Sequence, residues 1–161
     1  MNCLVFSIEK ICLEPVGFVQ TDAVGNEVRD KNVVSKIFLR EELTEALKGV
    51  EKFSHLFVVF WLHKIEEKER KIMKVRPRGR KYMPLLGIFA TRTPQRPNPI
   101  GLTRVKLLNI KGNVVTVQGL DAFDRTPVLD IKPFDICDTT EDFKVPDWWM
   151  KLEKERIIKN E

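Results

Sequence analysis

The stretch Phe53–Leu62, which reads FSHLFVVFWL, decides the fold. It is almost continuously apolar and aromatic, a pattern that is typical of a strand buried on both faces. We therefore expect it to be the central and most buried strand of a sheet. His55 lies near its start, where we interpret it as a core histidine bonded to backbone, with a functional role as the alternative. His63 and Lys64 follow its end, so we expect them at the open end of the sheet, where ligands often bind.

Short apolar runs on both sides of this stretch predict further strands. They cover residues 3–8, 15–19, 33–39, 71–75, 104–110, 114–120 and 126–131. Two helices are expected, a short one at Glu41–Lys48 that ends at Gly49 and a C-terminal one at about 147–158 that Asp147 can cap. Because strands outnumber helices, the sequence predicts a mainly all-β fold, a single small β-barrel domain over residues 1–161 with two or three short peripheral helices.

The composition fits one globular domain, with 43% hydrophobic and 32% charged residues in 161. No apolar run approaches the roughly 20 residues of a membrane helix, and the N-terminus lacks the features of a signal peptide. We therefore expect a cytoplasmic protein without a membrane partner. Cys3, Cys12 and Cys137 are odd in number and widely spaced, so we expect reduced, mostly buried thiols and no disulfide framework or metal site.

The segment Gly87–Arg104, GIFATRTPQRPNPIGLTR, is dense in prolines and hydrogen-bond donors. Prolines at positions 94, 97 and 99 exclude a helix or a central strand and stiffen the loop. Arg92, Arg96 and the neighbouring hydroxyl and amide groups suit an anionic or hydroxyl-rich ligand. A proline-rich turn with solvated arginines explains the same composition, so the segment alone leaves both interpretations open.

The net charge of +5 is unevenly distributed. Between Lys68 and Lys81 there are eight basic residues and one acidic residue, whereas the balance reverses between Asp121 and Asp147. A basic patch beside an acidic lobe predicts that a polyanion binds at a surface separate from a second, pocket-bound ligand. A merely solvated charged surface is the alternative.

Three blocks of the sequence together resemble the TsaA/TrmO family: FSHLFVVFWLH at Phe53–His63, ATRTPQRPNPIGLT at Ala90–Thr103 and LDAFDRTPVLDIKPF at Leu120–Phe134. They occur in the family's order and spacing and, with the chain between them, span about half to two thirds of the protein. The resemblance implies a β-barrel that uses S-adenosylmethionine to methylate N6 of the threonylcarbamoyl-modified adenosine next to the anticodon of tRNA. It also implies a homodimer in which each partner helps complete the other's site. A monomer roofed by its own proline loop is the alternative.

The chain contains no G-x-G-x-x-G motif, which excludes a Rossmann-type cofactor site. The resemblance places S-adenosylmethionine, without a metal, between the end of the FWLH strand, the ATR segment and the turn near Asp124. An arginine suits the carboxylate of this ligand, and aspartates suit its ammonium and hydroxyl groups, although turn formation alone also explains the aspartates. The expected cofactor-binding residues are His63, Lys64, Arg92, Leu102, Asp121, Phe123, Asp124 and Arg125.

Methylation of an exocyclic nitrogen needs a proton acceptor, and Asp124 is the candidate catalytic residue. The family turn usually reads D-G-T-P, but Arg125 stands here in place of the glycine. If the backbone has positive φ at this position, arginine costs about 1–2 kcal/mol, so either the turn has relaxed or Arg125 makes a contact of its own. The expected tRNA-binding residues are Arg76, Arg78, Arg80, Lys81 and Arg96.

Two other functions fit the same residues. The first is a non-catalytic RNA-binding β-barrel, which would bind no S-adenosylmethionine. The second is a methyltransferase that acts on a different acceptor.

Overall fold

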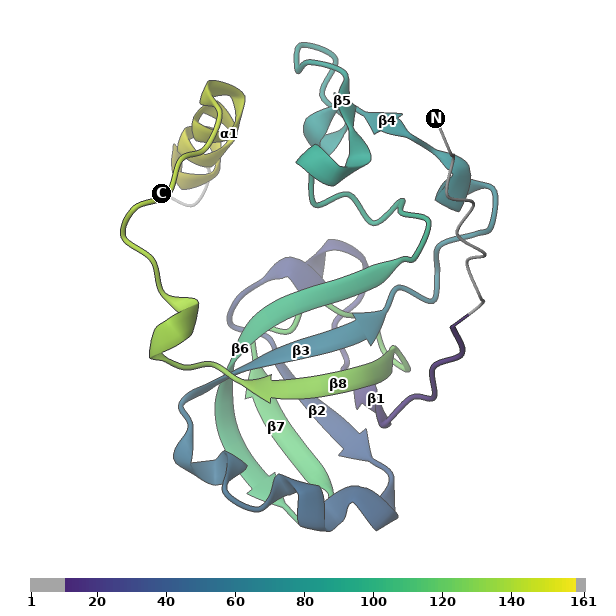
Figure 1. Cartoon of the computed structure of the whole chain (residues 1–161), viewed down its shortest axis with the longest axis vertical. Helices are drawn as coiled ribbons and strands as arrows, with labels where there is room; N and C mark the ends of the chain where they lie inside the picture. The colour runs from purple at the N-terminus through teal and green to yellow at the C-terminus, as the bar shows by residue number, and fades with distance from the viewer. Residues whose placement is uncertain (1–10, 159–161) are drawn as a thin grey trace, which may run out of the picture.

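The structure is a computed structural model that describes residues 11–158, with only the backbone described for 156–158. Six antiparallel strands form a closed barrel in the order β1–β2–β7–β6–β3–β8 (Figure 1). The small β-barrel predicted from the sequence is therefore confirmed. The barrel strands are β1 (Gly17–Gln20), β2 (Val34–Leu39), β3 (His55–Trp61), β6 (Ile100–Lys111), β7 (Val114–Gln118) and β8 (Pro127–Pro133).

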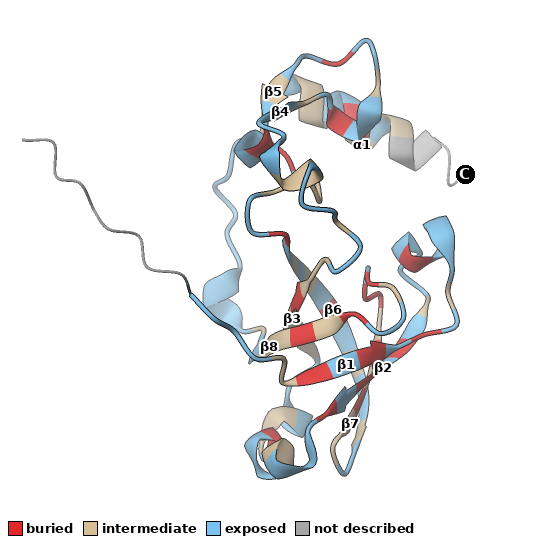
Figure 2. Ribbon diagram, turned by 90° about the vertical axis from the view of Figure 1, so that its right-hand side faces the viewer, coloured by how far each residue is buried: buried red, intermediate tan, exposed pale blue. Residues whose placement is uncertain are grey.

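A second, smaller body of structure lies at one end of the barrel. There β4 (Lys74–Val75) pairs with β5 (Leu86–Gly87), and the helix α1 (Asp147–Ile158) lies beside them (Figure 2). We call residues 69–90 together with α1 the upper lobe. The short 3-10 helices are η1 (Gly25–Arg29), η2 (Glu41–Leu47), η3 (Val50–Lys52), η4 (Glu69–Lys71), η5 (Pro77–Gly79), η6 (Ile88–Ala90) and η7 (Ile136–Asp138).

Several expected elements differ in detail. The short helix expected at Glu41–Lys48 is the 3-10 helix η2. The strand expected at 71–75 is wrong for most of its length, because only Lys74–Val75 pairs with another strand. Ile72 and Met73 of that segment are exposed, so most of it packs against no neighbouring strand. The strand expected at 3–8 lies outside the described residues, as does Cys3. Cys12 and Cys137 are free and exposed, so the expectation of buried cysteines is wrong for these two.

The strand β3 lies between β6 and β8, and its side chains alternate between the barrel interior and the outside. The expectation that it is buried on both faces is therefore wrong, because the closed barrel has one interior and the outward side chains are half-buried (Figure 2). Phe134 packs against Phe57 on the outer face, and Arg70 lies over the ring of Trp61. The fully inward side chains are Leu56, Val58 and Phe60.

The ring of Phe60 lies directly against the backbone of Gly101 on β6. A Cβ atom at Gly101 would lie 2.3 Å from Cε2 of this ring, so a residue with a side chain does not fit without a shift of the core. One residue beyond β3, the Leu62 N–H donates to the Pro99 carbonyl at 2.7 Å. This bond holds the end of the proline-rich loop against the end of β3.

Replacing Gly101 with alanine should lower the free energy of unfolding by about 1–3 kcal/mol, because the new methyl group must displace a buried ring. Equilibrium denaturation with urea measures this change. Gly87→Ala is the matched control, since a Cβ atom there meets no heavy atom within 4 Å and its φ of −58° suits alanine. Equal stability of Gly101→Ala and the parent would contradict the packing described for Phe60.

Candidate functional site

Two segments that are distant in sequence meet at one end of the barrel: the residues after β3 and the turn that joins β7 to β8. Nδ1 of His63 lies 3.3 Å from Oγ1 of Thr126, which is buried. Nζ of Lys64 lies 3.8 Å from the centre of the Phe123 ring, a cation–π contact. The structure therefore brings together the predicted residues His63, Lys64 and Phe123, and the turn places Asp124 and Arg125 beside them.

Hydrogen bonds to β1 fix the backbone of this turn. The Arg125 N–H donates to the Val19 carbonyl at 2.8 Å, and the Val19 N–H donates to the Thr126 carbonyl at 3.0 Å. Within the turn, the Thr126 N–H donates to the Phe123 carbonyl at 3.2 Å. Arg125 has a φ of 59°, the left-handed conformation that a glycine adopts without strain. The turn has therefore kept a glycine-like shape with an arginine in it.

The carboxylate of Asp124 is held from two sides. Oδ1 accepts the backbone N–H of Thr21 at 3.2 Å, and Oδ2 lies 3.8 Å from Nε of Arg125. About half of the side chain is exposed, at 49%. Asp124 therefore stabilises the turn, and it also presents a fixed and solvent-accessible carboxylate at the end of the barrel. The structural interpretation of this residue therefore applies, and the functional one stays a prediction.

Asp121 lies three residues before Asp124, in the connection that follows β7, and has different surroundings. Although the residue has exposed surface, partial burial of its carboxyl group raises the pKa, and the positive charges of Arg29 and Lys31 lower it in part. Lys31 is held close by, because its Nζ donates to the Gly119 carbonyl at 3.4 Å. These two cations compete with any cationic ligand group for the Asp121 carboxylate.

Among the described residues, no hydrogen bond, ion pair or ring contact joins Arg92 or Leu102 to this cluster. Leu102 is 60% exposed on the outer face of the barrel, where β6 pairs it with Val59. Arg92 is exposed in the loop after η6, and within residues 11–158 its side chain forms no hydrogen bond or ion pair. Its guanidinium group is therefore available to a ligand.

The pKa of His63 lies below the ordinary value of 6.5, because partial burial and then the charge of Lys64 disfavour the imidazolium form. The imidazole ring is consequently neutral at pH 7. In that form Nδ1 can share one proton with the Thr126 hydroxyl, as donor or acceptor according to the tautomer.

Two of the residues predicted to bind RNA connect residues 69–90 to α1 within the upper lobe. Arg78 donates to the carbonyl of Leu152 at 3.1 Å, and Leu152 is itself buried. Arg80 forms an ion pair with Glu155, and the Tyr82 hydroxyl donates to the same carboxylate at 2.9 Å. These two cations therefore hold α1 against residues 69–90.

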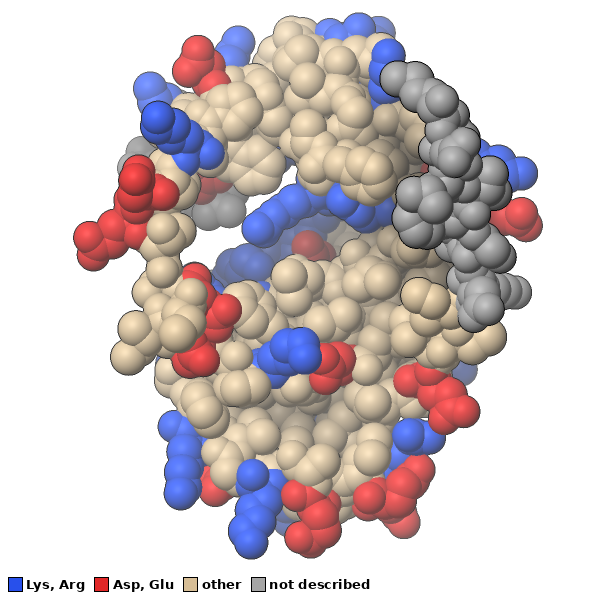
Figure 3. Space-filling view, in the orientation of Figure 1, with Lys and Arg blue, Asp and Glu red and all other residues tan. Residues whose placement is uncertain are grey.

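The other predicted RNA-binding residues have different surroundings. Arg76 donates to the Met83 carbonyl, and Lys81 is exposed. Arg96 lies in the proline-rich loop and donates to the Thr91 carbonyl at 3.0 Å. Lys and Arg side chains also line a hollow between the barrel and the upper lobe (Figure 3). On this face, the surface between the barrel and the upper lobe is therefore cationic.

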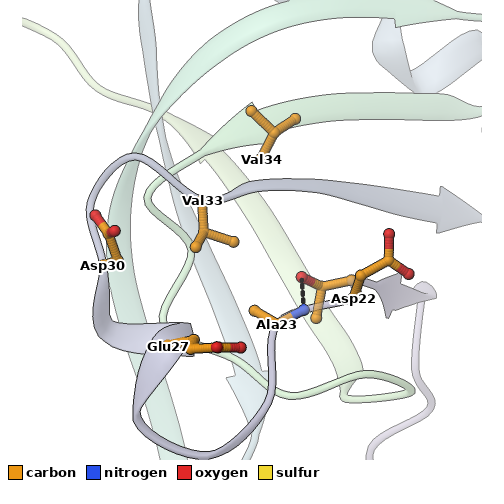
Figure 4. A pocket seen from close by; sticks show the side chains of 7 residues that line it. Asp22, Ala23, Glu27, Asp30, Val33 and Val34 are labelled. Carbon is orange, nitrogen blue, oxygen red and sulfur yellow. Dashed lines mark hydrogen bonds between the residues drawn. The ribbon is translucent and has the colours of Figure 1, made fainter.

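A separate cavity of about 440 Å³ opens beside the connection between β1 and β2 (Figure 4). Two of its carboxylates cap local backbone: Glu27 accepts the Val24 N–H at 3.0 Å, and Asp30 accepts the Asn32 N–H at 2.8 Å. The predicted cofactor residues do not line this cavity. The lining residues are Thr21, Asp22, Ala23, Glu27, Asp30, Val33 and Val34.

Sequence reasoning missed two threonines of the site. Thr126 contacts His63 across 63 positions, and Thr21 contacts Asp124 across 103 positions. No local sequence pattern predicts either contact, because each forms only when the barrel closes. In the part of the chain that the structure describes, no three His, Cys, Asp or Glu side chains are placed to hold a metal ion. No described helix is long and apolar enough to cross a membrane.

Residues 22–138 match the model of the tRNA-methyltransferase O N-terminal domain. The chain belongs to this family. A protein of Methanothermobacter thermautotrophicus, named a probable S-adenosyl-L-methionine-binding protein, is 42% identical over 131 residues that cover 78% of this chain and 90% of that protein. A protein of Methanocaldococcus jannaschii with the same description is 42% identical over 123 residues, or 76% and 90% of the two chains.

The fold is similar to the crystal structure of TrmO from Pseudomonas aeruginosa, with a TM-score of 0.70 and 26% identity. The match covers 89% of this chain and 63% of that one, so the chain spans less than two thirds of that TrmO. A mouse tRNA (adenine(37)-N6)-methyltransferase is 45% identical over 91 residues, 55% of this chain and 20% of that protein. The resemblance to the TsaA/TrmO family seen in the sequence is thus confirmed.

The imidazole of His63 should titrate with a midpoint below pH 6.5, because burial and Lys64 lower its pKa. The unfolded state then binds more protons than the folded state between the lowered pKa and 6.5. Stability should therefore rise with pH through that window and be lost as pH falls through the folded-state pKa. Proton NMR measures the titration, with His63→Gln to assign the signals. A midpoint at or above 6.5 would show that the surroundings of His63 differ from those described.

Proposed function

We propose that this protein is an S-adenosylmethionine-dependent methyltransferase that methylates N6 of the adenosine next to the anticodon of tRNA. The observation that carries the proposal is the cluster of His63, Lys64, Phe123 and Asp124 at the barrel end, in a chain of the tRNA-methyltransferase O N-terminal domain family. Relatives named S-adenosyl-L-methionine-binding proteins and a tRNA (adenine(37)-N6)-methyltransferase support it. The threonylcarbamoyl-modified adenosine is the proposed substrate.

The predicted cofactor residues fit S-adenosylmethionine by their chemistry. Arg92 and Lys64 supply cations for its carboxylate, and Arg92 is without another partner among the described residues. Phe123 supplies an aromatic face for the adenine, and Leu102 an apolar one. Asp121 and Asp124 supply oxygens for the ammonium and hydroxyl groups. When it is bound, S-adenosylmethionine supplies an electrophilic methyl group.

The proposed catalytic role of Asp124 is to accept the proton that the adenosine amino group loses when it is methylated. The turn holds this carboxylate in place through Thr21 and Arg125, while part of it stays open to solvent. A carboxylate fixed in this way can accept a proton without a covalent intermediate. His63, neutral at pH 7, contacts the neighbouring Thr126 and adds no positive charge to those of Lys64 and Arg125.

We further propose that the working form is a cytoplasmic homodimer and that tRNA binds across the upper lobe. The apolar side chain of Ile100 is exposed on β6, opposite Trp61 at the end of β3, where a second copy would cover it. Lys81 and Lys74 are exposed cations of the lobe. Arg78 and Arg80 complete that basic surface while they hold α1.

Incubation of the protein with tRNA and S-adenosylmethionine should produce N6-methylated adenosine, which mass spectrometry of the nucleosides detects. Arg92→Ala should weaken binding of S-adenosylmethionine by about 1.5–3 kcal/mol, because a charge-assisted contact is lost. Isothermal titration calorimetry measures this affinity in the absence of tRNA.

The control for that variant is Arg40→Ala, since Arg40 pairs with Glu14 and Glu42 away from the candidate site. Unchanged affinity in a folded Arg92→Ala would assign Arg92 to another ligand. A parent protein that gives no binding heat would favour the non-catalytic RNA-binding barrel. Binding of S-adenosylmethionine without N6 methylation of tRNA would favour a different acceptor.

Replacing Lys74 and Lys81 with glutamine should weaken tRNA binding and reduce its dependence on salt. Each lost phosphate contact should flatten the slope of log K against log salt by roughly one unit. These lysines are preferable to Arg78 and Arg80, whose loss would also release α1. The double variant Lys52→Gln and Lys111→Gln removes the same charge outside the upper lobe. A salt slope equal to that of the parent would place the RNA on another face.

A further inference from the structure

Phe89 is the most exposed aromatic side chain among residues 11–155, with 78% of its surface accessible. It lies at the centre of η6, between the predicted cofactor residue Arg92 and the two-stranded sheet of the upper lobe. The preceding residue, Ile88, is only 2% exposed. Ile88 therefore anchors η6 in the lobe, and the short helix presents the phenyl ring of Phe89 to solvent.

The backbone that carries Phe89 is tightly fixed. The carbonyl of Ile88 accepts three hydrogen bonds, from the Thr91 N–H at 3.1 Å, the Thr91 hydroxyl at 2.9 Å and Nη1 of Arg96 at 3.5 Å. The Ile88 N–H donates in turn to the Met73 carbonyl at 3.1 Å. With Ile88 already buried and its carbonyl saturated, the turn cannot rotate to bury Phe89 instead. The hydrogen bonds of this loop therefore hold the Phe89 ring in its exposed position.

A fixed cation accompanies the ring. The guanidinium carbon of Arg96 lies 5.5 Å from the centre of the Phe89 ring, and its Nη1 is also bonded to the carbonyls of Thr91 and Thr93. An exposed aromatic ring beside a positive charge is the combination that binds single-stranded RNA, because the ring stacks on a base and the cation attracts the phosphate. A purely apolar protein partner would gain nothing from a cation at that position.

The loop also connects this ring to the candidate site. The proline-rich segment runs from Arg92 to Pro99, whose carbonyl accepts the Leu62 N–H at the end of β3. Lys64 lies two residues further along the chain. A base held on Phe89 is thus held by a stiff loop that ends beside the residues proposed to bind the methyl donor.

We propose that Phe89 is a substrate-binding residue on which an unpaired base of the tRNA anticodon loop stacks, with Arg96 beside it for the adjacent phosphate. The proposal rests on the proposed function, since it identifies the part of the tRNA that this loop contacts. It assigns to Phe89 a role in holding the RNA and none in binding S-adenosylmethionine.

The test uses a fluorescently labelled RNA hairpin with the sequence of a tRNA anticodon arm, whose affinity is measured by anisotropy. Phe89→Leu keeps an apolar side chain but removes the ring, and should weaken RNA binding by roughly 5- to 150-fold. Phe89→Trp keeps a stacking surface and should restore the affinity. Calorimetry should show the same affinity for S-adenosylmethionine in all three proteins.

Phe18→Leu is the matched control. Phe18 is also an exposed phenylalanine, but it lies on the outer face of β1, where it pairs with Phe38. This variant should bind the RNA hairpin as the parent does. An equal loss in Phe18→Leu and Phe89→Leu would show a general effect of the substitution and would overturn the assignment.

Three further outcomes separate this proposal from the proposed function. If Phe89→Leu binds the hairpin as tightly as the parent, the stacking role is wrong and the methyltransferase proposal stands. If the parent binds neither the hairpin nor whole tRNA, the proposed function fails and the stacking role fails with it. If sedimentation shows that Phe89→Leu dissociates a dimer while each monomer keeps its RNA affinity, the ring belongs to a subunit interface and the proposal is overturned.

Discussion

The contact between the Phe60 ring and the backbone of Gly101 is the constraint on which the rest of the structure depends. It allows β3 and β6 to pair in register from His55–Lys106 to Trp61–Ile100 while a large ring fills the barrel beside them. Because β3 and β6 stay paired up to Trp61 and Ile100, the Leu62 N–H lies within hydrogen-bond distance of the Pro99 carbonyl. The proline-rich loop and the segment after β3 consequently share one end of the barrel, which is where the candidate site lies.

The upper lobe shows how a basic cluster can serve the fold and a ligand at once. Arg78 and Arg80 contact a main-chain carbonyl and the Glu155 carboxylate of α1, so each has lost part of its capacity to bind phosphate. The contacts nevertheless fix both guanidinium groups at the surface, which lowers the entropy lost when a ligand binds. The helix follows the region 22–138 that matches the family model. In this chain, residues beyond the family domain therefore shape the surface proposed to bind RNA.

The sequence predicted the barrel and most of its strands, because alternating apolar residues and a glycine hairpin are local signals. The sequence-based prediction was wrong where burial depends on closure of the barrel. The apolar outer residues of β3 are half-buried by Phe134 and Arg70, and no local sequence pattern indicates these contacts. Similarly, β6 starts at Ile100, before the expected position 104, because Gly101 pairs with Phe60. The three blocks that resemble the family indicated the candidate site residues, whereas their partners Thr21 and Thr126 could be found only from the fold.

The strain at Arg125 shows that the barrel, and not the turn sequence, determines the shape of the site. A left-handed arginine costs about 1–2 kcal/mol. Relaxing the turn would break its bonds to Val19 in both directions and the bond between Thr21 and Asp124, each of which contributes about 0.5–1.5 kcal/mol. Together these bonds exceed the strain, so the glycine-like conformation survives the loss of the glycine. The arginine then adds a positive charge 3.8 Å from the Asp124 carboxylate, where a glycine would add none. Arg125 therefore adopts the backbone conformation that suits a glycine and alters the electrostatic field of the site.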